Sequence, residues 1–96
     1  MKTEDQIQKI TEEVTKFYDD NALLNGLYFQ GEERDHVINI GTSILCTKWN
    51  VGYPGGGFVQ AVVNNDLMQS FSKADHINSK AIKFYCSLIY DVSIPF

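Results

Sequence analysis

Residues 3–20, TEDQIQKITEEVTKFYDD, carry the clearest structural pattern in the chain. Apolar side chains recur there at steps of three, four, three and one, at Ile7, Ile10, Val14, Phe17 and Tyr18. This spacing places them along one stripe of an amphipathic helix. Thr3 and Gln6 fit a capping box, in which each side chain satisfies a backbone N–H of the first turn. The sequence therefore predicts a helix over residues 4–20.

Helical spacing also dominates the rest of the chain. Residues 58–74 have a broad apolar face, and Asp75 is placed to cap a last helix over residues 76–90. Residues 35–50 fit either a strand or a helix, because they are rich in β-branched residues that also recur at helical spacing. We favour a helix there, since Gly41 interrupts a segment that is long for one strand.

The expected fold class is therefore mainly α, a small three- to four-helix bundle that forms a single domain over residues 1–96. Residues 21–34 break the helical pattern. The part near residues 23–31, in which Gly26 and Gly31 flank residues 27–30, is compatible with a loop, a short strand or a hairpin.

The charge of the chain is unevenly distributed and excludes some partners. The net charge is −4, and residues 1–35 hold nine acids against four bases. A protein that binds polymeric nucleic acid needs clustered Lys and Arg, and none is present, so we expect no such partner. No apolar run is long enough to span a membrane. The acidic surface fits either a basic partner protein or, more commonly, a solvated helix face.

Cysteine and histidine usage predicts neither a disulfide nor a metal. Cys46 and Cys86 are the only cysteines, which favours buried thiols in a reducing cytoplasm. Each lies ten residues after a histidine, His36 or His76, and the close pairs typical of zinc sites are absent. Paired carboxylates and Ser/His/Asp motifs are also absent, so we expect no cofactor, no metal and no enzymatic activity.

The glycine-rich segment before the third expected helix is the first candidate for a binding site. Glycines allow a ligand to approach the backbone, and a helix start offers free N–H groups to an anion. Aromatic residues just before the segment are able to stack on a base. A tight loop that merely leads into a helix is the competing interpretation. The residues concerned are Trp49, Tyr53, Gly55, Gly56, Gly57 and Phe58.

Polar residues inside the same expected helix are the second candidate. Asn64, Asn65 and Asp66 are three poor helix formers in a row, which calls for a compensating contact or a solvated position. With Lys73, the two asparagines would supply polar contacts to a ligand or a subunit interface. A solvent-exposed helix back explains them about equally well.

The C-terminal half contains a motif that resembles one from small uncharacterised proteins of tailed phages and prophages. Residues 56–67, GGFVQAVVNNDL, match the pattern G-G-F-x-x-A-V-x-x-N-D-L, and Lys73 stands where that family usually has Arg. The resemblance does not extend to residues 1–45. It implies a phage origin and a mainly helical fold, and it implies no activity.

Together these observations lead to two functional hypotheses. The first is a phage-encoded, non-enzymatic anti-defence or regulatory protein that sequesters a small phosphorylated, nucleotide-type host signal. The second is a protein-interaction module that inhibits a host protein through an acidic or aromatic surface. Small size favours a homo-oligomer, because 96 residues leave little room for both a core and an enclosed pocket.

Overall fold

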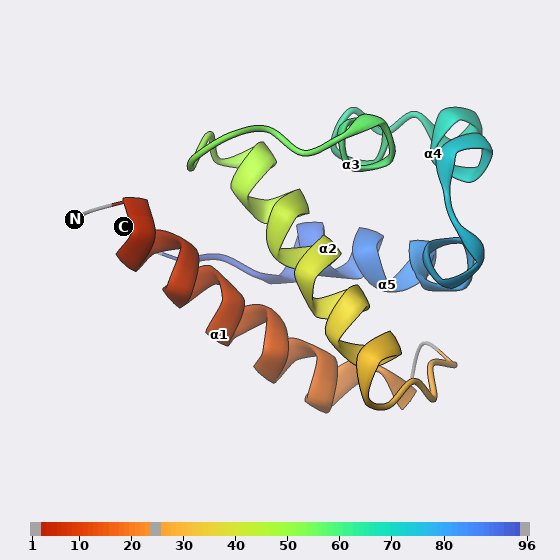
Figure 1. Ribbon diagram of the computed structural model, residues 1–96, viewed down its shortest axis with the longest axis horizontal. Coiled ribbons are helices and arrows are strands. Elements are labelled where there is room, and N and C mark those ends of the chain that lie inside the picture. Colours follow the sequence, from red (N-terminus) through yellow and green to blue (C-terminus); the bar gives the residue numbers. More distant parts are fainter. Residues whose placement is uncertain (1–2, 24–25, 95–96) are drawn as a thin grey trace.

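The fold is organised around α2, which contacts α1, α3 and α5. The computed structural model describes residues 3–23 and 26–94, and these residues form five helices and no strand. The helices are α1 (Thr3–Asn21), α2 (Glu32–Lys48), α3 (Gly57–Val63), α4 (Leu67–Lys73) and α5 (His76–Asp91). Helix α2 crosses in front of α5 and α1 runs beside α2, while α3 and α4 lie together at one end (Figure 1).

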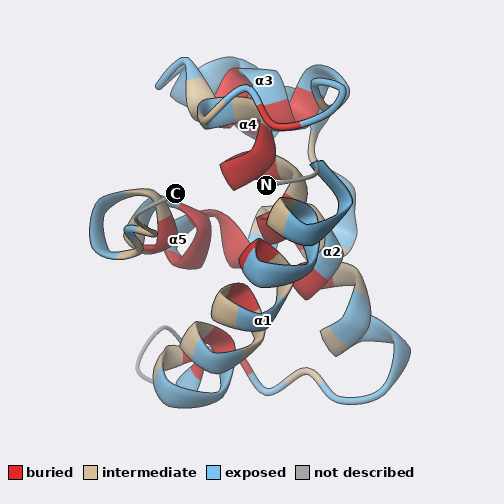
Figure 2. Ribbon diagram, turned by 90° about the vertical axis from the view of Figure 1, so that its left-hand side faces the viewer, coloured by how far each residue is buried: buried red, intermediate tan, exposed pale blue. Residues whose placement is uncertain are grey.

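The predicted amphipathic stripe of α1 forms its contact with α2 and α5. Ile10, Val14 and Tyr18, spaced by four, are buried, whereas Ile7 remains exposed. Figure 2 shows that the buried residues of the helices are turned towards the centre of the molecule. Mainly helical architecture is thus confirmed, with α1 close to its predicted bounds.

Gly41 explains why α2 is able to sit between two other helices. A Cβ at this position would lie 3.0 Å from Cγ1 of Val14 and 3.1 Å from Cδ2 of Leu88. Glycine inside a helix costs about 1 kcal/mol relative to alanine. Here it allows α1 and α5 to approach α2 closely, so the residue that interrupts the apolar pattern has a packing role.

The predicted helix over residues 58–74 is wrong as a single element, which raises the helix number above the expected three to four. Asn65 has a φ of 59° directly after α3, and the N–H groups of Asn65 and Asp66 donate to the carbonyls of Val62 and Ala61. These two bonds form a Schellman motif that ends α3. The Asp66 carboxylate then accepts from the N–H of Gln69 and starts α4. The polar run is therefore a helix break.

The segment between α1 and α2 forms a loop in its described part, so the short strand or hairpin considered near residues 23–31 is not seen there. Leu27 is buried in the core, and the carbonyl of Phe29 accepts from the Tyr18 hydroxyl at 3.2 Å. A lone extended segment has no strand to pair with, and these contacts to α1 hold it instead. Residues 24–25 of that prediction lie outside the described residues.

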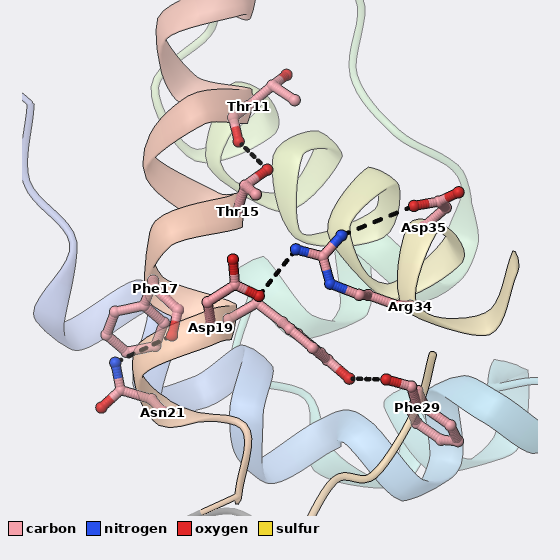
Figure 3. Close-up of polar contacts among 9 residues, drawn as sticks. Thr11, Thr15, Phe17, Asp19, Asn21, Phe29, Arg34 and Asp35 are labelled. Carbon is pink, nitrogen blue, oxygen red and sulfur yellow. Dashed lines mark hydrogen bonds and ion pairs between the residues drawn. The ribbon is translucent and has the colours of Figure 1, made fainter. Parts of the chain in front are cut away.

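A polar cluster fixes the angle between α1 and α2 next to this loop. Arg34 of α2 donates to Asp19 of α1 at 2.8 Å, and its guanidinium lies 5.6 Å from the centre of the Tyr18 ring (Figure 3). Burial raises the pKa of the Tyr18 hydroxyl, and the nearby Arg34 charge opposes that rise. The only arginine of the chain is therefore used to join two helices.

Candidate functional site

The loop between α2 and α3 contains two aromatic residues with different surroundings. Trp49 is the C-cap of α2 and packs half-buried against the core, so one face of its ring is already covered. Tyr53 is 94 % exposed. Of the two proposed stacking residues, Tyr53 is the one whose ring stands in solvent.

Gly55 serves the packing of the loop. A Cβ there would lie 2.6 Å from both Oγ of Ser43 and Cγ1 of Val59, a separation that real side chains do not tolerate. Its N–H donates to Oγ1 of Thr47 at 2.8 Å, and its carbonyl accepts from Nε2 of Gln60 at 2.7 Å. The backbone groups of Gly55 are therefore already used inside the protein.

Gly56, Gly57 and Lys73 come together at the start of α3. Both glycines are exposed, and the space around Gly56 is open. A Cβ at Gly57 would lie 3.1 Å from Cδ and 3.6 Å from Nζ of Lys73, so the lysine chain from the last turn of α4 lies over this backbone. Within the described residues Lys73 has no acidic partner. An ammonium beside open backbone is compatible with an anion.

The remaining candidate residues do not join this group. Phe58 is buried, with its ring centre 5.8 Å from that of Tyr85. Asn64 and Asn65 end α3, and a seven-residue helix separates its two ends by about 10 Å. The residues expected to form one nucleotide site therefore lie in three places, at the start of α3, at the end of α3 and in the core.

Sequence reasoning missed an uncovered apolar surface on the other side of α4. Ser70 is the buried residue of this helix, and a turn of about 100° per residue places Leu67, Phe71 and Met68 successively further around one flank. They are 60 %, 52 % and 83 % exposed. Lys73, Gln69 and Ser72 occupy the opposite flank. The apolar residues expected in the core are therefore in solvent.

Helix α5 continues this surface. Cys86 lines a hollow with Leu67 of α4, and the exposed Tyr90 lines the adjoining hollow with Val62 and Val63 of α3. Tyr90 is 86 % exposed. Two adjoining hollows lie between the helices, and they are lined by Val62, Val63, Asn65, Leu67, Ser70, Ile82, Cys86, Ile89 and Tyr90. We call this surface the α4–α5 face, defined by Leu67, Met68, Phe71, Cys86, Ile89 and Tyr90.

The hollows are suited to a side chain more than to a whole ligand. Their volumes are about 20 and 220 Å³, whereas small-molecule sites usually enclose about 300–1,000 Å³. The residue pattern that leads to this face is visible in the sequence. The Asn64–Asp66 break rotates α4 relative to α3, so one continuous apolar stripe becomes a buried half and an exposed half.

A chain of polar contacts links α2 to the core of α5. His36 Nε2 lies 3.0 Å from Oδ2 of Asp75, whose Oδ1 accepts from the N–H of Asn78. The buried Tyr85 hydroxyl donates to Oδ1 of Asn78 at 2.7 Å. Each partner is satisfied within the protein, and Asp75 acts as the predicted cap of α5. The chain fits a role in holding helices together.

The two thiols differ in environment. Cys46 is buried, and this burial raises the pKa of its thiol, which disfavours the nucleophilic thiolate. Cys86 is exposed on the α4–α5 face. Across residues 3–23 and 26–94, no three His, Cys, Asp or Glu side chains are grouped so that they could hold a metal ion.

No protein-family model, curated protein or solved structure matches the chain. The resemblance to phage proteins therefore stays a prediction. In the described part of the chain no helix has both the length and the apolar character needed to cross a membrane. The fold and the site define a class in general terms: a small helical protein with an uncovered apolar face.

Proposed function

We propose that the protein is a non-enzymatic protein-interaction module and that the α4–α5 face is its binding surface. One observation carries the proposal: four large apolar side chains, Leu67, Met68, Phe71 and Tyr90, are more than half exposed. Two adjoining hollows that share Cys86 connect Leu67 of α4 with Tyr90 of α5. Contiguous apolar surface of this kind is costly to leave in water and commonly marks a site of association.

The acidic surface supports an interaction role less directly. Acids of α1 and the start of α2 are largely exposed, which is the ordinary state of a solvated helix face. Leaving them in water costs little, whereas leaving Met68 and Tyr90 there costs apolar hydration. Within the phage setting that the resemblance implies, the module would inhibit a host protein and act as an anti-defence or regulatory factor.

Site-specific photo-crosslinking in the host cell tests the proposal. A benzophenone amino acid is placed at position 68 or 90, and at position 53 as a matched control, because Tyr53 and Tyr90 are both exposed tyrosines. We expect positions 68 and 90 to give discrete crosslinked proteins that position 53 does not give. Equal, diffuse crosslinking at all three positions, or none, would contradict the proposed binding surface.

Sequestration of a phosphorylated ligand is the second candidate, and the position of Lys73 over Gly57 favours it. Native mass spectrometry with a panel of nucleotides checks it. A discrete adduct is expected that is lost in Lys73→Ala and Gly56→Val but kept in Lys80→Ala, which removes the same charge elsewhere. An adduct that survives all three substitutions would exclude this site.

A further inference from the structure

We infer that the occupant of the α4–α5 face is a second copy of this chain, related by a two-fold axis. The inference rests on the proposed function, because it names the partner of the same surface. A two-fold contact uses one patch twice, so the patch has to be complementary to itself in charge, in area and in shape.

The charge of the face permits self-association although the chain carries a net charge of −4. Leu67, Met68, Phe71, Cys86, Ile89 and Tyr90 bear no formal charge. The acid-rich α1 makes no contact with α3 or α4, so it is directed away from this face. Two copies are therefore able to meet here without bringing their acidic helices together, and like-charge repulsion is largely avoided.

Charged residues at the margin of the face are complementary to each other. Asp66 stands at the start of α4, and helical spacing places Lys83 beside Cys86 and Tyr90 on the outer edge of α5. These two side chains carry opposite charges. A two-fold arrangement that brings Asp66 of one copy opposite Lys83 of the other would add attraction at the rim.

The area of the face approaches what a stable dimer requires. A large side chain carries about 150–250 Å² of surface, so Leu67, Met68, Phe71 and Tyr90 at their exposures present on the order of 500 Å². Two copies would bury about 1,000 Å² through these side chains alone, and specific interfaces bury roughly 1,200–2,000 Å² in total. Rim residues of both copies would have to contribute the remainder.

The shape of the face combines projections with hollows. Met68 and Tyr90 project furthest, at 83 % and 86 % exposure. Tyr90 borders a hollow that Val62, Val63 and Ile89 also line, and its volume of about 220 Å³ is large enough for one large side chain. A projecting residue of one copy therefore has a site on the other, which is how interface anchors are usually seated.

Sedimentation analysis of the full chain with one matched pair of variants tests the inference. Tyr90→Lys places two like charges across the proposed contact, while Tyr53→Lys makes the same change at another exposed tyrosine. We expect the natural chain and Tyr53→Lys to be dimers at micromolar concentration. Tyr90→Lys should dissociate at least about 30-fold more readily, as loss of an interface anchor does. Because position 90 is exposed, an unchanged circular dichroism spectrum will show that the fold is intact.

Cys86 gives an independent readout in the unmodified protein. It is exposed on the α4–α5 face, while Cys46 is buried and serves as the internal reference. If the dimer forms through this face, thiol labelling of Cys86 slows several-fold as protein concentration rises through the dissociation constant. The rate for Tyr90→Lys should not depend on concentration.

The dimer and the proposed binding surface can be tested separately, because different results contradict each of them. A chain that is monomeric up to hundreds of micromolar, or a dimer that Tyr90→Lys leaves intact with Cys86 freely labelled, overturns the inference. If positions 68 and 90 then crosslink only to a host protein, the proposed binding surface stands with another partner. If they crosslink to nothing, both fail. Crosslinks between two copies of the chain support both.

Discussion

At the scale of single residues, Tyr85 shows how burial links packing to titration. Its ring is fully buried between Phe58 and Phe84, and its hydroxyl donates to Asn78. Burial raises the pKa of this hydroxyl far above its ordinary value, and the Asp75 carboxylate adds to the rise. The native state therefore holds Tyr85 in its neutral form.

This shift predicts a loss of stability in alkali. Below the unfolded-state pKa of about 10, Tyr85 is protonated in both states and pH has no effect. Above it, the unfolded chain releases the proton while the native chain keeps it, so the free energy of unfolding falls. Burial raises the pKa values of Cys46 and Tyr18 as well, and both act in the same direction.

Denaturant titrations between pH 8 and 11 check this prediction. Tyr85→Phe should be less stable at pH 7 by about 1 kcal/mol, because Asn78 loses its donor. Its stability should also fall less steeply above pH 10. Tyr28→Phe, at a tyrosine that is 77 % exposed, is the matched control for loss of a hydroxyl that is not buried. Identical alkaline slopes for the natural chain and Tyr85→Phe would contradict the assignment.

At the scale of elements, the sequence predicted a helix correctly where the apolar residues form a single buried stripe along it. The spacing in α1 and the Asp75 cap of α5 are local signals, and both predictions are confirmed. Helix α2 was correctly chosen over a strand, although it begins at Glu32 rather than near Asp35. Acids in its first turn favour that start, yet Gly31 provides no side-chain cap for the pattern to reveal.

The split between α3 and α4 could not be read from apolar spacing, because Phe58, Val62 and Phe71 fit one continuous helix. The backbone of Asn65 ends α3, because this residue adopts a positive φ. Asparagine tolerates this conformation better than most residues, but the sequence alone leaves it equally free to face solvent in a helix. The same ambiguity concealed the α4–α5 face and placed Asn64 and Asn65 in a ligand site.

The caps of α4 and α5 should have unequal effects when removed. Asp75→Ala removes a cap from a helix that lines the core and also breaks the contact with His36, so the global free energy of unfolding should fall by about 1–2 kcal/mol. Asp66→Ala affects a seven-residue helix at the edge. Hydrogen exchange should accelerate mainly in residues 67–73 of that variant.

Denaturant unfolding and amide hydrogen exchange of Asp75→Ala and Asp66→Ala measure whether the two caps differ in their effect on global stability. Asp91→Ala provides the control, since it removes the same charge from the other end of α5. If Asp66→Ala lowers global stability as much as Asp75→Ala does, then α4 unfolds together with the core. In that case α4 would be a firm part of the bundle.

At the scale of the whole molecule, the chain measures 35 × 26 × 23 Å and distributes its surfaces unequally. The acidic helix α1 lies at the lower left of Figure 1 and α4 at the upper right. Of the residues selected for a ligand, Gly56, Gly57 and Lys73 are brought together by this arrangement, a tertiary contact that no local pattern encodes.

Self-association through an uncharged face predicts two properties in solution. The melting temperature should rise with protein concentration, because only the folded chain dimerises. Dimer dissociation should change little between 50 and 500 mM NaCl, since rim charges alone are screened. Calorimetry and sedimentation at these salt concentrations measure both. A dissociation constant that shifts tenfold or more with salt would instead indicate a contact through the acidic surface.

Trp49, the only tryptophan of the chain, ends α2 and packs half-buried against the core. Its fluorescence therefore reports on the junction between α2 and α3. Unfolding should move its emission to longer wavelength, because the indole then passes from the core into water. The protein thus carries an intrinsic optical probe of folding.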